Sequence, residues 1–150
     1  MTAGRPAYLQ WRNLGIVAVG GMVGTAIREL LSLVVPSVRG LPIAIFGINI
    51  LGAFALGMLL EALARRGPDE GRLRTLRLLL GTGVLGGFTT YSALATDTSL
   101  LLVDGRVAAA LIYSLASLIV GALSTWGGIA MAASLHRHRE EGPRESEVAR

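Results

Sequence analysis

Long apolar runs alternate with short polar breaks along the chain. The apolar runs cover residues 14–35, 41–64, 76–103 and 107–135. At a rise of about 1.5 Å per residue, each run is long enough to cross a hydrocarbon core of about 30 Å as an α-helix. Pro36 and the tight turn Asp104-Gly105 separate neighbouring runs, because neither favours a continuing helix. The pattern therefore predicts an all-α integral membrane protein with four transmembrane helices.

Three polar segments flank these runs. Residues 1–13 form an N-terminal segment, and the apolar run that follows is too long for the core of a signal peptide, so we expect the segment to remain. Residues 65–75 contain Gly67-Pro68 and several charges, which predicts a solvated loop. Residues 136–150 are charged and lack a hydrophobic period, so we expect a disordered polar tail.

The third run differs from a simple lipid-facing helix. It contains Gly81, Gly83, Gly86 and Gly87, and each glycine weakens a helix by roughly 1 kcal/mol relative to alanine. We therefore expect this helix to be broken near its middle, at residues 86–90. A break frees backbone groups, which a membrane tolerates only where they pack against protein or line a watery cavity. The alternative is that the glycines serve only close helix packing.

Polar residues also occur inside the first two runs. Arg28 is costly at membrane depth, and either a packing or vestibule role or simple anchoring at the interface explains it. Asn49 is the one strongly polar residue in the interior of its run, and its amide both donates and accepts hydrogen bonds. A buried asparagine either bridges two helices or offers its amide hydrogens to an anion without a full positive charge.

The fourth run carries small and hydroxyl residues at three- and four-residue spacing, which places them on one helical face. These residues are Ser114, Ser117, Gly121, Ser124 and Gly128, and Tyr113 lies on a neighbouring line. Such a face is either a close-packing surface or a polar track beside a pore. Both interpretations predict that it faces inward.

Composition agrees with a membrane protein. Charged residues make up 16% of the chain, hydrophobic residues 52%, and the mean hydropathy is +0.58, whereas soluble domains are typically about 25% charged. The chain has no cysteine, which excludes disulfides and thiolate metal sites. Its basic residues are all arginine, and their placement indicates membrane orientation and not nucleic-acid binding. The sequence shows no nucleophile paired with a base, no cluster of metal ligands and no phosphate-binding loop, so nothing in it indicates an enzyme.

Several motifs together resemble one family. Gly86-Gly87-Phe88-Thr89-Thr90-Tyr91-Ser92 resembles the third-helix motif of the Fluc/CrcB fluoride channels. Gly20-Gly21-x-x-Gly24-x-x-x-Arg28, Asn49-x-x-Gly52, and Tyr113 with Ser117 resemble the motifs of its first, second and fourth helices. The resemblance covers about residues 14–135, in order and with one motif per helix.

The resemblance implies a fluoride-selective channel that exports fluoride from the cytoplasm passively and assembles as an antiparallel dimer. It assigns the anion pathway to Asn49, Thr90, Tyr91, Ser92, Tyr113 and Ser117. It also implies a structural sodium ion, not transported, that is bound at the dimer centre by main-chain carbonyls of Gly86 and Thr89. The resemblance places Arg28 either in the vestibule of the channel or at a helix-packing position.

The chain departs from the family pattern at one position. Tyr91 corresponds to the first phenylalanine of the family's pore pair, whereas the second falls on Leu94, which has no polar ring edge. Asp97 takes the family's acidic position. We expect a pore that uses Leu94 to be impaired or differently lined.

Two other functions compete. A small proton-coupled exporter also has four helices, but it requires a carboxylate in the middle of a helix, whereas Glu29 and Glu61 lie toward helix ends and Asp97 lies beyond the break. A non-transporting membrane scaffold could use the same glycine faces. It would not need Asn49, the hydroxyl-rich break and the serine face together.

The arginines are unevenly divided between the two sides of the predicted bundle. One side has only Arg39 and Arg106. The other receives Arg5, Arg12, Arg65, Arg66, Arg72, Arg74, Arg77, Arg137, Arg139, Arg144 and Arg150. This bias predicts a multi-pass protein of the plasma or inner membrane with both termini in the cytoplasm. An antiparallel homodimer requires one chain to insert into the membrane in both directions. The uneven distribution of arginines and the leucine at position 94 together therefore favour a heterodimer with an oppositely oriented homologue.

Overall fold

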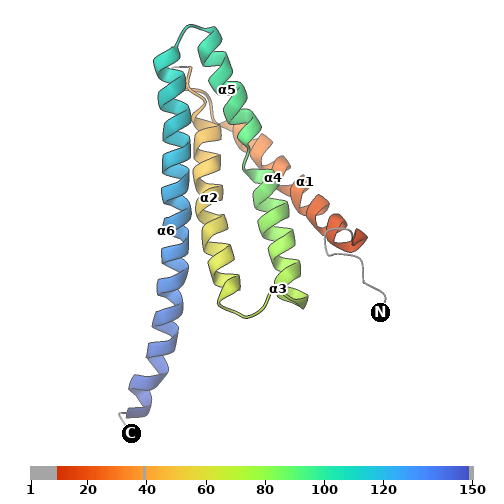
Figure 1. Cartoon of the computed structure of the whole chain (residues 1–150), viewed down its shortest axis with the longest axis vertical. Coiled ribbons are helices and arrows are strands. Elements are labelled where there is room, and N and C mark those ends of the chain that lie inside the picture. The colour runs from red at the N-terminus through yellow and green to blue at the C-terminus, as the bar shows by residue number, and fades with distance from the viewer. Residues whose placement is uncertain (1–9, 39, 149–150) are drawn as a thin grey trace, which may run out of the picture.

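The computed structural model describes residues 10–38 and 40–148. Within them the chain is helical, and it has 4 helical segments that are long and apolar enough to span a membrane. The predicted all-α membrane fold is therefore confirmed (Figure 1). Most of the predicted N-terminal segment lies outside the described residues, as do Arg5, Arg39 and Arg150, which form part of the orientation argument.

The first two spans are continuous helices close to their predicted ranges. Helix α1 is Trp11–Val34 and helix α2 is Ile43–Ala64. Helix α1 begins three residues before the apolar run, because Trp11, Arg12 and Asn13 extend it toward the polar side. Helix α2 begins two residues after the predicted start at residue 41, and Pro42 flanks its first residue.

The third span is broken, as predicted. It consists of α3 (Gly71–Leu76), the π-helical segment η2 (Arg77–Leu85), α4 (Gly86–Phe88) and α5 (Tyr91–Val103). Thr89 and Thr90, between α4 and α5, have extended backbones with ψ values of 151° and 119°. The loop expected over residues 65–75 is shorter in the structure, because α3 already begins at Gly71 and makes about one and a half turns of that range helical. Arginine and leucine in this segment favour a helix.

Helix α6 (Val107–Val148) is much longer than the predicted fourth span. Composition predicts a disordered tail from residue 136, whereas the structure continues the helix as far as Val148 (Figure 1). Extending an existing helix costs far less than nucleating one, and arginine and glutamate are good helix formers. At about 1.5 Å per residue the helix is roughly 63 Å long, so its C-terminal part extends beyond a bilayer core.

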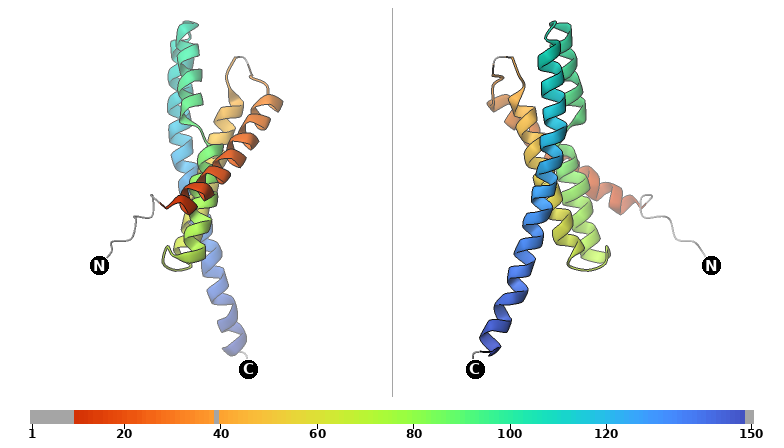
Figure 2. Two further views of the ribbon diagram at one scale, coloured as in Figure 1. Left: turned by 90° about the vertical axis from the view of Figure 1, so that its right-hand side faces the viewer. Right: turned by 60° about the vertical axis from the view of Figure 1, so that its left-hand side comes forward.

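The two halves of the broken span pack on different neighbours. Helix α1 crosses η2 and α4, α5 packs along α6, and α2 contacts elements on both sides of the break (Figures 1 and 2). The crossing of α1 depends on glycine: a Cβ built on Gly20 would lie 2.9 Å from the Cα of Gly83, and one on Gly24 would lie 2.8 Å from the amide nitrogen of Phe88. Gly20 and Gly24 therefore let the backbone of α1 approach the third span closely.

Helices α2 and α6 also approach closely. A Cβ on Gly128 would lie 2.9 Å from the amide nitrogen of Met58, and one on Gly57 would lie 3.0 Å from the carbonyl carbon of Thr125. Ser117 and Gly128 are buried, which confirms that the small-residue face of α6 points inward. The opposite faces of the helices are covered with exposed leucine, isoleucine and valine, as expected for surfaces that meet lipid or another chain.

Candidate functional site

The break interrupts the hydrogen-bond ladder of the third span at a few identifiable groups. In a continuous α-helix, the amides of residues 90, 91, 92 and 93 would bond to the carbonyls of residues 86, 87, 88 and 89. The amide of Thr89 still donates to the carbonyl of Leu85, at 2.9 Å. Beyond it the chain becomes extended, so the next four carbonyls and amides need other partners.

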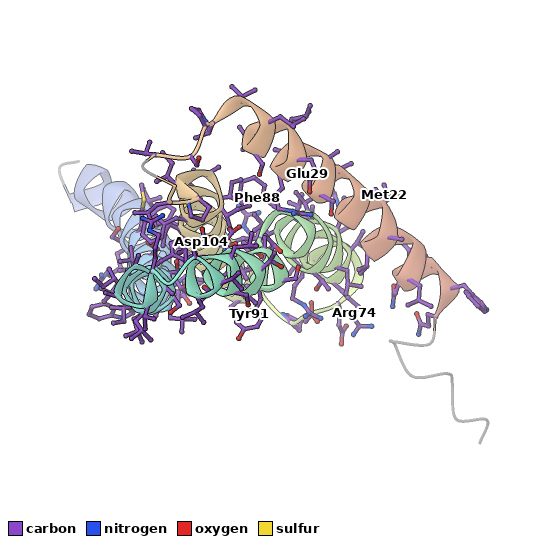
Figure 3. All side chains as sticks on the ribbon, turned by 90° about the horizontal axis from the view of Figure 1, so that it is seen from above. Met22, Glu29, Arg74, Phe88, Tyr91 and Asp104 are labelled. Atoms are coloured by element: carbon purple, nitrogen blue, oxygen red, sulfur yellow. The ribbon has the colours of Figure 1, made fainter. Side chains whose placement is uncertain are left out.

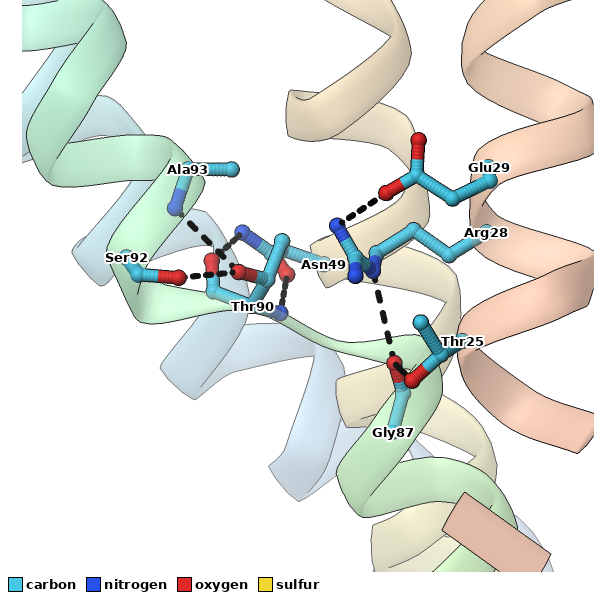
Figure 4. Close-up of polar contacts among 8 residues, drawn as sticks. All are labelled: Thr25, Arg28, Glu29, Asn49, Gly87, Thr90, Ser92 and Ala93. Carbon is cyan, nitrogen blue, oxygen red and sulfur yellow. Dashed lines mark hydrogen bonds and ion pairs between the residues drawn. The ribbon is translucent and has the colours of Figure 1, made fainter. Parts of the chain in front are cut away.

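Asn49 of α2 holds one end of the break. Its Nδ2 donates to the carbonyl of Thr90 at 3.0 Å, and its Oδ1 accepts a hydrogen bond from the amide of Thr90 at 2.8 Å (Figure 4). The side-chain amide therefore pairs with both backbone groups of one residue. The structure thus brings together two residues that the family resemblance assigns to the anion pathway, and it gives Asn49 a bridging contact as well.

Two side chains of α1 hold the other end of the break. The hydroxyl of Thr25 donates to the carbonyl of Gly87 at 3.3 Å, and Arg28 Nε donates to the same oxygen at 3.4 Å (Figure 4). Arg28 also forms an ion pair with Glu29, at 3.0 Å, and its side chain is 18% exposed. Arg28 therefore points toward the break and not toward the membrane interface.

These bonds leave a defined set of backbone groups without a partner. Among the described residues, the carbonyls of Gly86, Phe88 and Thr89 accept no hydrogen bond, and the amides of Tyr91 and Ser92 donate none. The carbonyls of Gly86 and Thr89 are the two that the family resemblance assigns to a sodium ion. The two carbonyls are oxygen ligands of the kind that a hard cation such as sodium prefers. The two amides begin α5, where the helix dipole favours an anion.

A pair of hydroxyls lies beside the free amides. Thr90 Oγ1 accepts a hydrogen bond from the amide of Ala93 at 3.2 Å and lies 3.1 Å from Ser92 Oγ (Figure 4). The pair has two hydroxyl hydrogens, and one hydrogen bond between them uses one. Whichever oxygen is the donor, one hydroxyl hydrogen remains available for a ligand.

The remaining predicted pathway residues lie in two different environments. Tyr91 is 76% exposed and projects away from the other helices of this chain (Figure 3). Tyr113 and Ser117 are instead buried, at 7% and 6% exposure. The hydroxyl of Tyr113 donates to Asp97 Oδ2 at 3.3 Å, and Ser117 Oγ donates to the carbonyl of Tyr113 at 2.7 Å. A single chain therefore does not bring Tyr91 together with Tyr113 and Ser117.

Leu94 also lies in the interior. It is 6% exposed and packs in an apolar cluster with Leu101, Ala110 and Tyr113, between α5 and α6. This environment explains a leucine at the position, because the side chain fills a packed seam. The seam continues to a cavity of about 200 Å³ whose lining includes Ser37, Asp97 and Asp104, near the loops that join the helices at that end.

Two sets of contacts were not predicted from the sequence. Thr25 lies three residues before Arg28, on the same helical face, so the spacing could have indicated a shared target. In the 65–70 loop, Asp69 accepts hydrogen bonds from Arg77 Nε and Nη2, at 2.9 and 2.6 Å. The hydrogen bonds from Arg77 lower the pKa of Asp69 below its usual value, against a smaller upward effect of desolvation.

Comparisons with known proteins identify the family of this helical arrangement. The model of the family described as CrcB-like protein, Camphor Resistance (CrcB), matches residues 15–129. The chain belongs to the CrcB family. The match includes α2, η2, α4 and α5 and most of α1, and it ends within α6 before the long C-terminal continuation.

Individual CrcB relatives are similar over most of their length. The chain is 51% identical over 130 residues to fluoride-specific ion channel FluC 2 of Leifsonia xyli subsp. xyli, covering 87% of this chain and 90% of the relative. It is 44% identical over 129 residues to fluoride-specific ion channel FluC 1 of Cutibacterium acnes, covering 84% and 90%. It is 38% identical over 125 residues to fluoride-specific ion channel FluC of Chelativorans sp., covering 82% and 98%.

Proposed function

We propose that this CrcB-family chain is a subunit of a fluoride-specific ion channel, and that it is not an enzyme. The observation that carries the proposal is the broken third span, whose free amides and spare hydroxyl hydrogen lie at membrane depth in a chain of this family. Hydrogen-bond donors are what a small anion needs to replace its water. Hydrogen fluoride enters cells as a neutral acid and dissociates at neutral pH, so a passive anion pathway driven by the negative-inside potential exports fluoride and reduces its toxicity.

The proposed anion pathway passes the N-terminal end of α5. The amides of Tyr91 and Ser92, together with the spare hydroxyl hydrogen of the Thr90–Ser92 pair, provide three donors there. Asn49 Nδ2 uses one hydrogen on Thr90 and has a second to donate. The positive edge of the Tyr91 ring supplies a further contact for an anion. Each contribution is a partial charge, so the ion is solvated without being trapped.

Tyr113 and Ser117 form a second part of the proposed pathway. Their hydroxyls lie along the buried seam between α5 and α6, apart from Tyr91. A pathway that uses both sets needs surfaces from more than one chain. The exposure of Tyr91, a residue with a polar hydroxyl at membrane depth, supports a partner chain against this face.

We further propose that the chain forms an antiparallel dimer with a structural sodium ion at its centre. The free carbonyls of Gly86 and Thr89 would hold the ion, two from each chain, which is the oxygen-only donor set that sodium accepts. Gly86 is exposed, and a Cβ built on it would meet only the carbonyl of Gly81, at 3.8 Å. This open side leaves room for a second backbone to approach.

The arginine bias supports a fixed orientation with both termini in the cytoplasm, and hence an oppositely oriented homologue as the partner. Expressing this chain alone and mapping single cysteines introduced at each terminus with a membrane-impermeant reagent tests this. We expect labelling from one side only, and fluoride flux only when the homologue is co-expressed. Labelling from both sides together with strong flux from the single chain would show a homodimer.

Efflux from proteoliposomes tests the function itself. Vesicles loaded with fluoride should release it when valinomycin lets potassium follow, and vesicles loaded with chloride should not. Matched vesicles with a proton gradient and a cationic drug test the exporter alternative. Failure of fluoride efflux from every combination of chains, with correctly inserted protein, would overturn the channel; failure of all three fluxes would favour the scaffold.

A further inference from the structure

We infer that Arg28 is a positioning residue for the cation site at the break, acting through the carbonyl of Gly87. This inference rests on the sodium part of the proposed function. The starting observation is that α1 donates two hydrogen bonds, from Thr25 and Arg28, to a single carbonyl between the two proposed sodium ligands (Figure 4).

The carbonyl of Gly87 needs these donors because the break removes its own. Its partner in a continuous helix would be the amide of Tyr91, which lies beyond the extended residues Thr89 and Thr90. An unpaired carbonyl at membrane depth is costly and would reorient toward any donor or cation. Arg28 and Thr25 therefore fix the direction of the Gly87 peptide, and with it the orientation of the adjoining Gly86 carbonyl.

Close backbone contacts at glycines hold α1 at the distance from which Arg28 contacts the carbonyl of Gly87. Gly87 lies against the backbone of Gly21, and a Cβ on Gly87 would be 3.0 Å from the Cα of Gly21. Gly24 meets the backbone of Val84 and Phe88 in the same way. Helix α1 thus touches the end of the half-helix by backbone contact, and the arginine one turn further along reaches the carbonyl from the side.

Charge alone does not account for this arrangement. A bare guanidinium beside a cation site would repel the cation, but Glu29 forms an ion pair with Arg28 at 3.0 Å and offsets its charge. The pair therefore acts mainly through the direction of its hydrogen bond. Asn49 acts on the opposite side of the break, where it holds Thr90. Because the amide of Thr90 and the carbonyl of Thr89 belong to one planar peptide unit, Asn49 orients a proposed sodium ligand as well as the anion pathway, whereas Arg28 acts on the cation side alone.

Sodium-dependent thermal stability tests the inference without relying on transport. The full chain, with its partner if one is required, is purified in detergent, and its Tm is measured against sodium concentration, with a large organic cation replacing sodium. For Arg28→Gln we expect the sodium concentration at half-maximal stabilisation to rise about tenfold, the effect of losing one charge-assisted hydrogen bond. Arg28→Lys keeps a donor and should recover part of the shift. Arg12→Gln, the same change near the start of α1, should leave the half-point unchanged.

Fluoride flux distinguishes positioning from a general structural role. If Arg28 positions the site, Arg28→Gln should lose more flux at low sodium than at saturating sodium, whereas a general structural role should lower the flux equally at both. Should Arg28→Gln fail to assemble, Thr25→Val removes the other donor to Gly87 and should raise the sodium concentration at half-maximal stabilisation about threefold.

The inference would be overturned if Arg28→Gln left this sodium concentration unchanged. Where Arg28→Gln does not assemble, an unchanged value in Thr25→Val would overturn it. So would an equal shift in Arg12→Gln or a wild-type Tm indifferent to sodium. Absence of fluoride flux with the sodium shifts intact would refute the channel and leave the inference standing.

Discussion

Replacing Asn49 with leucine should separate the stability of the break from its transport role. Leucine has a similar volume but makes neither of the two hydrogen bonds that Asn49 forms with Thr90, at 3.0 and 2.8 Å. Hydrogen bonds between membrane helices are worth roughly 0.6 kcal/mol each on average, which gives a loss of about 1 kcal/mol. The amide and carbonyl of Thr90 are then both left without these partners, and each buried backbone group left unsatisfied costs about 1–3 kcal/mol in place of that net value. We therefore expect a loss of about 2–6 kcal/mol in the free energy of unfolding.

The assay is denaturant unfolding in detergent, combined with fluoride efflux from proteoliposomes. Because the side-chain donor and the geometry of Thr90 are lost together, efflux per correctly folded protein should fall by about tenfold or more. Leu51→Ala is the control, since Leu51 lies on the same helix and is 63% exposed. Unfolding and efflux of Asn49→Leu that both match those of Leu51→Ala would refute the bridging role and the pathway role of Asn49.

Three further predictions follow from the glycine contacts and the loop. Gly24→Val should reduce folded protein strongly, because its Cβ would overlap the backbone of η2 and α4 at Val84 and Phe88. Gly15→Ala, with nothing within 4 Å, should be tolerated, and thermal melts compare the two variants. Gly86→Val should leave the isolated chain helical but weaken dimer assembly, measured by chemical cross-linking, and normal assembly would contradict a backbone contact there. Because its hydrogen bonds from Arg77 lower the pKa of Asp69, the contribution of this pair to stability should be fully present above about pH 4 and lost as the pH falls through the lowered pKa. Hydrogen exchange of the loop should therefore be unchanged between about pH 5 and 8 when corrected for intrinsic rates, and Asp69→Asn should remove the low-pH transition.

The four spans and the break could be predicted from the sequence, since they depend on local properties. Apolar length decides whether a helix crosses a bilayer, and the glycines around Gly86 together with the adjacent threonines weaken the third helix at one place. The inward face of α6 was also predictable, because Ser117 and Gly128 recur with helical spacing. The C-terminal limit of α6 was not, because hydrophobic periodicity cannot detect a helix that continues from an existing one.

Only the tertiary structure decided which partner each group at the break receives. Helical spacing places Thr25 and Arg28 on one face, but it does not indicate that their shared target is the carbonyl of Gly87. Nor does it indicate that Asn49 pairs with Thr90, 41 residues away. These contacts depend on the crossing of α1 over η2 and of α2 past the break, and the crossings depend on backbone approach at several glycines at once. Sequence patterns report which face of a helix is apolar or small, whereas the direction of a hydrogen bond depends on where another helix lies in space.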